Sequence, residues 1–280
     1  MEFTKKYLKK LIKIIKKPEM KVLPGNIAFF LVLSIFPIIT LCGFLATFFN
    51  VSIDSVINLM NDVLPTEVNN ILVPYITGNG MDLHIGFSII LGYIVASNGA
   101  HSIIVSCNTL YGLEHSSYLK RRIKALFITI LLLALFVFSL IVLAFGNNIL
   151  KFILSMNIFD SLGDKIYYLF LLLKWPIAII VIFIMIKLIF ILAPDSVIKS
   201  KITTRGAFFT SIAWLISTFI YSYYVQHFSH YDIFYGSLSN IIVMMMWIYI
   251  LSCSLVIGIA INVQNYRNYE NKSSDIVDNK

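Results

Sequence analysis

The chain has 280 residues, of which 59% are hydrophobic and only 13% are charged. A water-soluble protein of this length needs more charge to cover its surface, so the composition excludes an ordinary soluble enzyme and makes a bilayer the solvent for much of the chain. The formal net charge of +8 would suit a nucleic acid partner, but the basic residues lie almost entirely in the two terminal segments and in every second loop between the apolar segments, which argues against one.

Six apolar segments are long enough to cross a bilayer as helices, since a span needs roughly 20 such residues. We therefore predict an all-α fold, a polytopic membrane protein with six transmembrane helices at 27–49, 84–107, 123–146, 167–192, 206–226 and 238–263. The predicted domains are a cytoplasmic basic helix at 1–22, a six-helix membrane domain at 23–265 and a cytoplasmic tail at 266–280.

The positions of the Lys and Arg residues predict the orientation. Of the 22 basic residues, 18 lie before the first span, between spans two and three, between spans four and five, or after span six. By the positive-inside rule these segments are cytoplasmic. The sequence thus predicts a multi-pass protein of the cell (plasma or inner) membrane with both termini in the cytoplasm.

Residues 4–17 predict a basic amphipathic helix, which Pro18 ends. We expect it in the cytoplasmic interface with its lysines toward anionic headgroups, so membrane lipids are the predicted partner. The helix would serve as a topology anchor, a lipid sensor or a docking site for a protein. No aromatic platform or groove-reading motif accompanies the lysines, so a nucleic acid partner is not expected.

Span one contains Ser34 and Pro37, which are candidate substrate contacts, and a proline kink is expected near the bilayer midplane at Pro37. The external segment 51–82 that follows has apolar residues at helical intervals, interrupted by Pro65. We predict one or two amphipathic helices there, on or in the outer leaflet.

Span two is interrupted by small and polar residues at 97–102, among them Asn98 and His101. Two interpretations are open. The segment breaks the helix and lines a cavity, in which case Asn98 and His101 would contact a substrate. Alternatively it forms a close helix crossing with hydrogen bonds between helices.

Span four carries Lys174 and Pro176 about two turns, on the order of 10 Å, from its external end. Pro176 is expected to kink the helix, and the cation beside the kink would meet an anionic headgroup or pair with an external carboxylate such as Asp232. Alternatively, Lys174 snorkels outward to the interface.

Span five ends in a dense group of polar aromatic residues, which includes Tyr224, Tyr231 and Tyr235 together with Asp232. An aromatic belt at the interface accounts for part of this group. The remainder predicts a short external hairpin that caps a cavity, with these four residues as candidate substrate contacts.

Motifs for catalysis are absent from the sequence. It has no phosphate-binding loop G-x-x-x-x-G-K-[ST], no H-E-x-x-H and no Cys-x-x-Cys. No predicted span contains Asp or Glu, and the cytoplasmic acids are scattered, which disfavours a proton relay or a two-metal centre. We expect no cofactor, no metal site and no enzymatic activity.

Several sets of residues form a recognisable pattern. They are Ala28-Phe29-Phe30 with Leu33-Ser34-Ile35-Phe36-Pro37, Asn108-Thr109-Leu110-Tyr111, Lys120-Arg121-Arg122, Pro194 with Gly206, and Phe228-Ser229-x-Tyr231-x-x-x-Tyr235-Gly236-Ser237-Leu238 with Trp247 and Tyr249. Over about residues 24–265 the chain resembles the YihY/BrkB family. The resemblance implies an inner-membrane protein linked to envelope integrity and serum resistance, with no catalytic residues to carry over.

The family's former label, ribonuclease BN, would imply tRNA processing, but that label is widely regarded as a misassignment and the scattered acids agree. One departure from the family pattern is visible at the end of span six. The family's G-A-E-L-N reads Gly258-Ile259-Ala260-Ile261-Asn262 here, which puts in doubt any family mechanism that needs this carboxylate.

The leading hypothesis is a transporter-like envelope protein that handles a lipid or an amphiphilic anion. It rests on the lysine-bearing span four, the polar segment of span two and the external hairpin. The alternative is a non-transporting scaffold for envelope assembly. The sequence leaves the substrate and the energy source open, and it is compatible with an oligomer.

Overall fold

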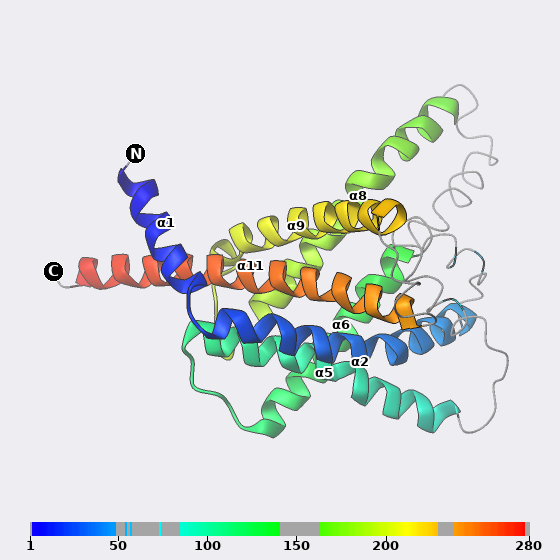
Figure 1. Ribbon diagram of the computed structural model, residues 1–280, viewed down its shortest axis with the longest axis horizontal. Coiled ribbons are helices and arrows are strands. Elements are labelled where there is room, and N and C mark those ends of the chain that lie inside the picture. Colours follow the sequence, from blue (N-terminus) through cyan, green and yellow to red (C-terminus); the bar gives the residue numbers. More distant parts are fainter. Residues whose placement is uncertain are drawn as a thin grey trace.

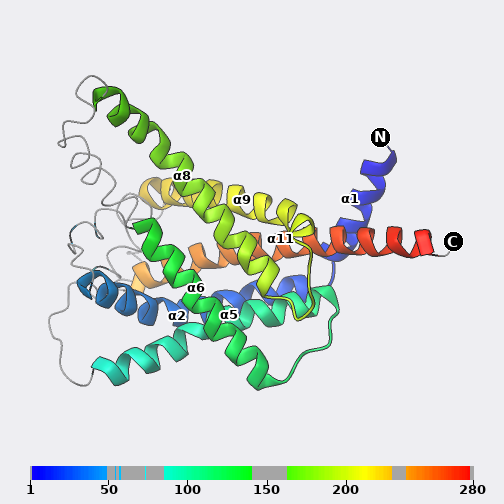
Figure 2. The same ribbon diagram turned by 180° about the vertical axis from the view of Figure 1, so that it is seen from behind.

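The structure is helical throughout the part of the chain that it describes. This computed structural model describes residues 2–48, 54, 57, 73, 85–140, 163–228 and 238–277. Seven helices can be delimited there and no strand occurs among these residues, which confirms the predicted all-α class for them (Figures 1 and 2). The helices are α1 (Glu2–Ile15), α2 (Glu19–Phe48), α5 (Ile85–Tyr111), α6 (Tyr118–Leu140), α8 (Gly163–Leu192), α9 (Ser200–Phe228) and α11 (Ser239–Val277).

Three helical segments within the described ranges are long and apolar enough to cross a membrane. They are Ile90–Tyr111, Ser200–Val225 and Ser239–Glu270, and Ile179–Leu192 is a shorter apolar segment. These segments fall on predicted spans two, five, six and four. The count of six spans stays a prediction, as do the domain boundaries. The predicted external helices over 51–82 lie outside the described residues except for Asp54, Ile57 and Val73.

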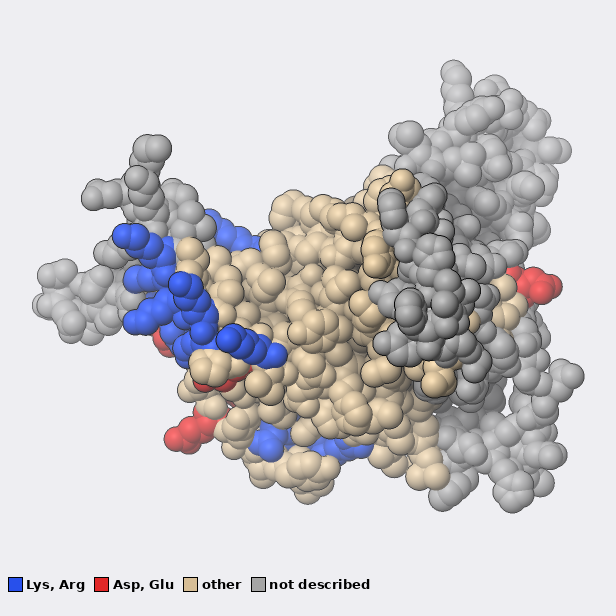
Figure 3. Space-filling view, in the orientation of Figure 1, with Lys and Arg blue, Asp and Glu red and all other residues tan. Residues whose placement is uncertain are grey.

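Both termini lie at the same end of the bundle (Figure 1). We call this the basic end and define it by α1 and the segments 112–117 and 193–199. Lys and Arg side chains gather there over α1 (Figure 3), where Lys9, Lys10 and Lys13 are exposed. The shared position of the termini agrees with an even number of crossings, whereas the cytoplasmic side of this end stays a prediction.

The amphipathic helix α1 ends at Ile15 and α2 begins at Glu19, so the predicted helix end before Pro18 is confirmed. The turn between them is closed by a hydrogen bond from the N–H of Lys17 to the carbonyl of Ile14 (3.1 Å). The side chain of Ile14 is only 3% exposed and α1 packs against α11. The helix is therefore anchored to the bundle by its apolar face.

Helix α5 ends in a glycine turn. Gly112 has φ = 72°, a conformation that costs glycine little and other residues more. The N–H of Leu113 donates to the carbonyl of Asn108 (2.9 Å) and the N–H of Gly112 to that of Thr109 (3.3 Å), which is the Schellman arrangement. This turn directs the segment 112–117 back toward α6.

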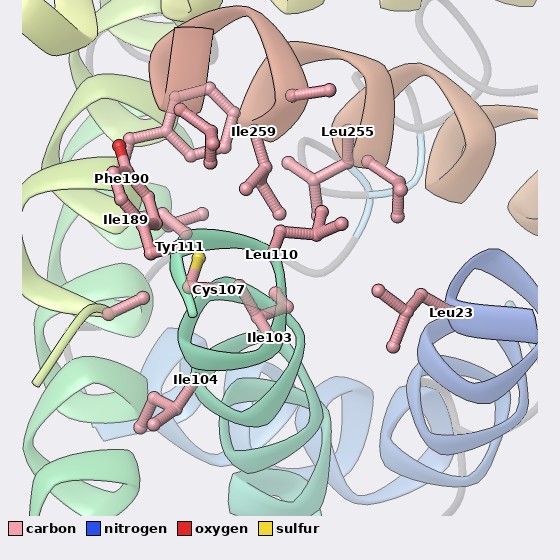
Figure 4. Close-up of a cluster of buried hydrophobic side chains, with 14 of the residues drawn as sticks. Leu23, Ile103, Ile104, Cys107, Leu110, Tyr111, Ile189, Phe190, Leu255 and Ile259 are labelled. Atoms are coloured by element: carbon pink, nitrogen blue, oxygen red, sulfur yellow. The ribbon is translucent and has the colours of Figure 1, made fainter. Parts of the chain in front are cut away.

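The buried core is centred on the C-terminal half of α5. Ile104 and Cys107 of α5 lie in one cluster with Leu23 of α2, Phe190 of α8 and Ile259 of α11 (Figure 4). Because lipid is as apolar as these side chains, close packing holds helices together within a membrane more than exclusion from water does. The four helices are thus fixed to one another at this level.

Helices α9 and α11 approach each other very closely at two glycines. The N–H of Gly206 donates to Asn262 Oδ1 (2.9 Å), and a Cβ at Gly206 would overlap both this oxygen and the carbonyl of Gly258. A Cβ at Gly258 would overlap Thr210 Oγ1. Small residues at such positions let two helix backbones meet, which is a common way of packing helices in membranes.

Helix α8 is packed at the basic end and exposed farther away from it. Ile186 and Phe190 are buried, while Pro176 and Ile180 are exposed. The helix crosses the bundle obliquely (Figure 2) and remains helical through Pro176. The side chains of Pro176 and Ile180, in the part of α8 away from the basic end, therefore face outward from the bundle.

Candidate functional site

The polar segment of α5 is a helix crossing and not a break. Residues 97–102 are helical, so the expectation of a cavity-lining break is wrong and the alternative of a close crossing is confirmed. The N–H of Gly99 donates to Ser34 Oγ of α2 (3.1 Å), and Ser34 Oγ donates to the carbonyl of Phe30 (2.6 Å). Both residues are buried, and the missing side chain at Gly99 makes room for the hydroxyl.

Pro37 lies at the same crossing. A Cβ at Gly92 would lie 3.4 Å from Pro37 Cβ, which is ordinary van der Waals contact. Gly92 and Gly99 are seven residues apart and so share one face of α5, which α2 covers. In this structure Ser34 and Pro37 are packing residues between α2 and α5.

Asn98 lies on another face of α5 and is bound by an arginine of α6. Arg122 Nη1 donates to Asn98 Oδ1 (2.6 Å) and Arg122 Nη2 donates to the carbonyl oxygen of Ile94 (2.7 Å). Both acceptors are neutral. The guanidinium is therefore oriented by two bonds but keeps its full charge.

His101 lies beside the first turn of α6. Its ring contacts that of Tyr118 edge to face with 5.8 Å between the centroids, and Arg121 and Arg122 act on it electrostatically. His101 Nε2 is screened from solvent and has no hydrogen-bond partner, and the same holds for Arg121 Nε. Residues of α5 and α6 thus form a cationic cluster with unused polar atoms.

A polar junction, formed by Asn108, Ser116, Lys124 and Asp195, joins three helices at the basic end. Asp195 Oδ2 accepts hydrogen bonds from Asn108 Nδ2 (2.6 Å), from Ser116 Oγ (2.9 Å) and from Ser116 N (3.2 Å). Lys124 Nζ forms a salt bridge with Asp195 Oδ1 (3.0 Å) and donates to the carbonyl of Pro194 (2.6 Å). The junction connects the end of α5, the start of α6 and the segment after α8.

The surroundings of Asp195 favour its charged form. Partial burial by itself raises the pKa of this carboxyl, but the hydrogen bonds from Lys124 and Ser116 outweigh it and lower the pKa from 3.8 to about 2. Asp195 is therefore ionised at any physiological pH. The negative charge that the polar junction needs for its salt bridge is therefore present throughout the physiological pH range.

The other predicted site residues that the structure describes do not lie with those around α5 and α6. Lys174 and Pro176 lie along α8, with Pro176 exposed, and Tyr224 is exposed on α9. Tyr231, Asp232 and Tyr235 lie outside the described residues. The structure thus groups Ser34, Pro37, Asn98 and His101 around α5 and leaves the described α8 and α9 candidates apart from them.

Sequence reasoning missed Arg122 and Asp195 as members of a site. A signal was present, because Arg122 belongs to one family-like motif and Asp195 directly follows Pro194 of another. Arg122 contacts a residue 24 positions away in the sequence, and the contacts of Asp195 are 71 or more positions away. Periodicity within one segment does not predict contacts between residues so far apart in the sequence. Among the described residues, no three His, Cys, Asp or Glu side chains gather in a way that could hold a metal ion.

A protein-family model described as "Virulence factor BrkB" matches residues 11–278, which is nearly the whole chain. The chain belongs to the BrkB family. This confirms the family resemblance and identifies a membrane protein. At the position where the family pattern has an acid, Ala260 is completely buried in the apolar core, so this BrkB chain places no carboxylate there.

Two curated proteins are similar to this BrkB-family chain. The "Putative ribonuclease-like protein YfkH" of Bacillus subtilis (strain 168) is 28% identical over 243 residues, which are 85% of this chain and 87% of that protein. The "UPF0761 membrane protein IL2447" of Idiomarina loihiensis (strain ATCC BAA-735 / DSM 15497 / L2-TR) is 27% identical over 89 residues, 32% of this chain and 31% of that protein. No solved structure matches the chain.

Proposed function

We propose that this BrkB-family membrane protein has a transporter-like role in the cell envelope and handles a lipid or an amphiphilic anion. The observation that carries the proposal is the fixed array of exposed lysines at the basic end. Lys9, Lys10 and Lys13 of α1 and Lys16 directly after it are exposed, while Ile14 of the same region is buried against the bundle.

An array of this kind suits an anionic surface. Lysines near a negatively charged leaflet contribute roughly 1 kcal/mol each, and an amphipathic helix adds the burial of its apolar side chains. Ile12 and Ile15 of α1 are exposed beside the lysines, so both parts of the interaction are present. Lys9, Lys10, Lys13 and Lys16, whose side chains the structure describes, form no salt bridge with a described carboxylate.

The transport part of the proposal is supported by α8. Lys174 stands two residues before Pro176, and the helix exposes Pro176, Ile179 and Ile180 along its outer part. A cation in an exposed apolar helix is costly unless an anion or water meets it. An anionic amphiphile would combine a charge that pairs with a lysine and an apolar part that suits the exposed Ile179 and Ile180.

A scaffold role is the second candidate. It is favoured by α11, which continues as one helix to Val277 and extends past α1 at the basic end (Figure 1). Such a projecting helix offers a surface to another protein. Stable co-purification of a partner, without stabilisation by lipids, would support this role.

The name of the Bacillus subtilis relative raises nuclease activity as a separate hypothesis for this chain. The protein purified to remove contaminating nucleases would be incubated with tRNA precursors and divalent metal ions. We expect no cleavage above that of a mock preparation. Metal-dependent cleavage that co-elutes with the protein would overturn the non-enzymatic proposal.

The direct test is native mass spectrometry of the protein purified in mild detergent. A variant with Lys9, Lys10, Lys13 and Lys16 all changed to Gln is compared with the wild type and with a control in which the same four residues are changed to Arg. We expect anionic lipids to remain on the wild type and the Arg control and to be depleted from the Gln variant. Equal lipid on all three, or none on any, would contradict the proposal.

A further inference from the structure

Arg122 of α6, whose side chain contacts α5, is separate from the α1 lysines and from Lys174. We infer that Arg122, held in place by Asn98, forms a binding site for the phosphate group of an anionic phospholipid, at the surface between α5 and α6. The site goes beyond the proposed function, because it would hold a lipid in a transporter and in a scaffold alike.

The first argument is the charge of Arg122. Its two hydrogen bonds go to Asn98 Oδ1 and to the carbonyl oxygen of Ile94, and neither acceptor carries a charge. Asp195 is held by Lys124 and the other members of the polar junction, and Arg122 forms no salt bridge with any described carboxylate. An oriented guanidinium without a carboxylate is a site for an external anion.

The second argument is the surface around it. The bond from Arg122 to the Ile94 carbonyl lies at an exposed position, and Ile94 and Ile123 on either side are 40% and 60% exposed. Ile90 and Phe127 extend this exposed apolar surface along α5 and α6. A charge on a membrane-facing apolar surface is costly, so a counter-ion that itself belongs to a lipid fits best.

The third argument is the position along α6. Arg122 is four residues after the first residue of the helix, about 6 Å along its axis. Tyr118 and Leu119 at the start of the helix are exposed, as expected near a headgroup region. The positive end of the helix dipole and the side chains of Lys120 and Arg121 add to the attraction for an anion there.

The fourth argument is the set of unused donors. Two of the five N–H donors of Arg122 are used in the bonds described, so others remain for a phosphate. His101 Nε2 and Arg121 Nε are screened from solvent, so the donors that a phosphate can reach are the remaining ones of Arg122. A guanidinium binds phosphate in a two-pronged geometry that the ammonium of a lysine cannot reproduce.

The experiment compares the full-length wild type with Arg122→Gln and with Arg205→Gln, which removes the same charge from an exposed position of α9. Each protein is titrated in detergent with phosphatidylglycerol, with phosphatidylcholine of the same acyl chains and with inorganic phosphate. Retained lipid is measured by native mass spectrometry and thermal stability by the apparent Tm. We expect Arg122→Gln to bind phosphatidylglycerol about tenfold more weakly and Arg205→Gln to bind it like the wild type.

Arg122→Lys is the second variant, because it keeps the charge even if Arg122→Gln folds poorly. We expect this variant to bind phosphatidylglycerol more weakly than the wild type at an unchanged yield. Equal phosphatidylglycerol binding by the wild type and both Arg122 variants would overturn the site. An equal response to inorganic phosphate and to phosphatidylglycerol would also overturn it, since it would show a simple anion site.

The result also separates this site from the proposed function. Loss of lipid from the four-lysine variant with full retention by Arg122→Gln would reject the Arg122 site and leave the proposed function standing. Loss from Arg122→Gln alone would support the site and reject α1 as the element that holds the lipid.

Discussion

Lys124 Nζ lies 3.0 Å from Asp195 Oδ1, and this ion pair connects α6 with the segment that follows α8. Both side chains are largely screened from solvent, at 25% and 11% exposure. Asp195 also binds Asn108 at the end of α5, so one carboxylate holds three helices together. A relative movement of α6 and α8 at the basic end would have to break these bonds.

Asp195→Asn is expected to destabilise the protein. The amide keeps the shape of the side chain but leaves the charge of Lys124 without its counter-ion, and the cost of such a change is about 2 kcal/mol. We expect the apparent Tm in detergent to fall by about 5 °C. Glu114→Gln, at an exposed position of the neighbouring segment, is the control and should leave the Tm unchanged.

The same carboxyl predicts how stability depends on pH. Its pKa is about 2 in the folded protein against an ordinary value of 3.8, so the unfolded chain binds its proton more readily. The stabilisation is thus complete above about pH 4 and is lost as the pH falls toward about 2. The Tm difference between wild type and Asp195→Asn should shrink over this interval, and a constant difference would contradict the assignment.

Gly206→Ala is expected to separate α9 from α11. The added methyl group would overlap Asn262 Oδ1 and the carbonyl of Gly258, and backbone atoms cannot move aside cheaply. We expect the free energy of unfolding to fall by about 2 kcal/mol, seen as a lower apparent Tm, or the protein to aggregate, seen as a smaller monodisperse fraction in size-exclusion chromatography. Gly25→Ala is the matched control, because a Cβ at Gly25 within α2 would meet no atom within 4 Å.

Lys174→Ala tests the transport part of the proposed function. If Lys174 meets an anionic substrate, the variant should lose substrate or lipid binding while its abundance in the membrane stays that of the wild type. Binding would be measured by native mass spectrometry and abundance by immunoblotting of membranes. Unchanged binding in a well-expressed variant would remove Lys174 from the site.

Local patterns predicted the ends of some elements well. Pro18 separates α1 from α2 as expected, because the pyrrolidine ring and the missing N–H disfavour the interior of a helix. The segment 97–102 shows the limit of such reasoning. Its composition was compatible with a broken helix and with a crossing, and Ser34 of α2, 65 residues from Gly99, decides in favour of the crossing.

The sequence by itself determined the helical class, the family and the position of the basic amphipathic helix. The class and the amphipathic helix follow from composition and from periodicity within one segment, where spacing along the chain fixes which side chains share a face, and the family follows from residue motifs that the chain carries. The tertiary structure alone decided that Arg122 lies on Asn98 and that Lys124 pairs with Asp195. These contacts depend on how helices pack against one another, and side chains on different helices meet only after that packing is set.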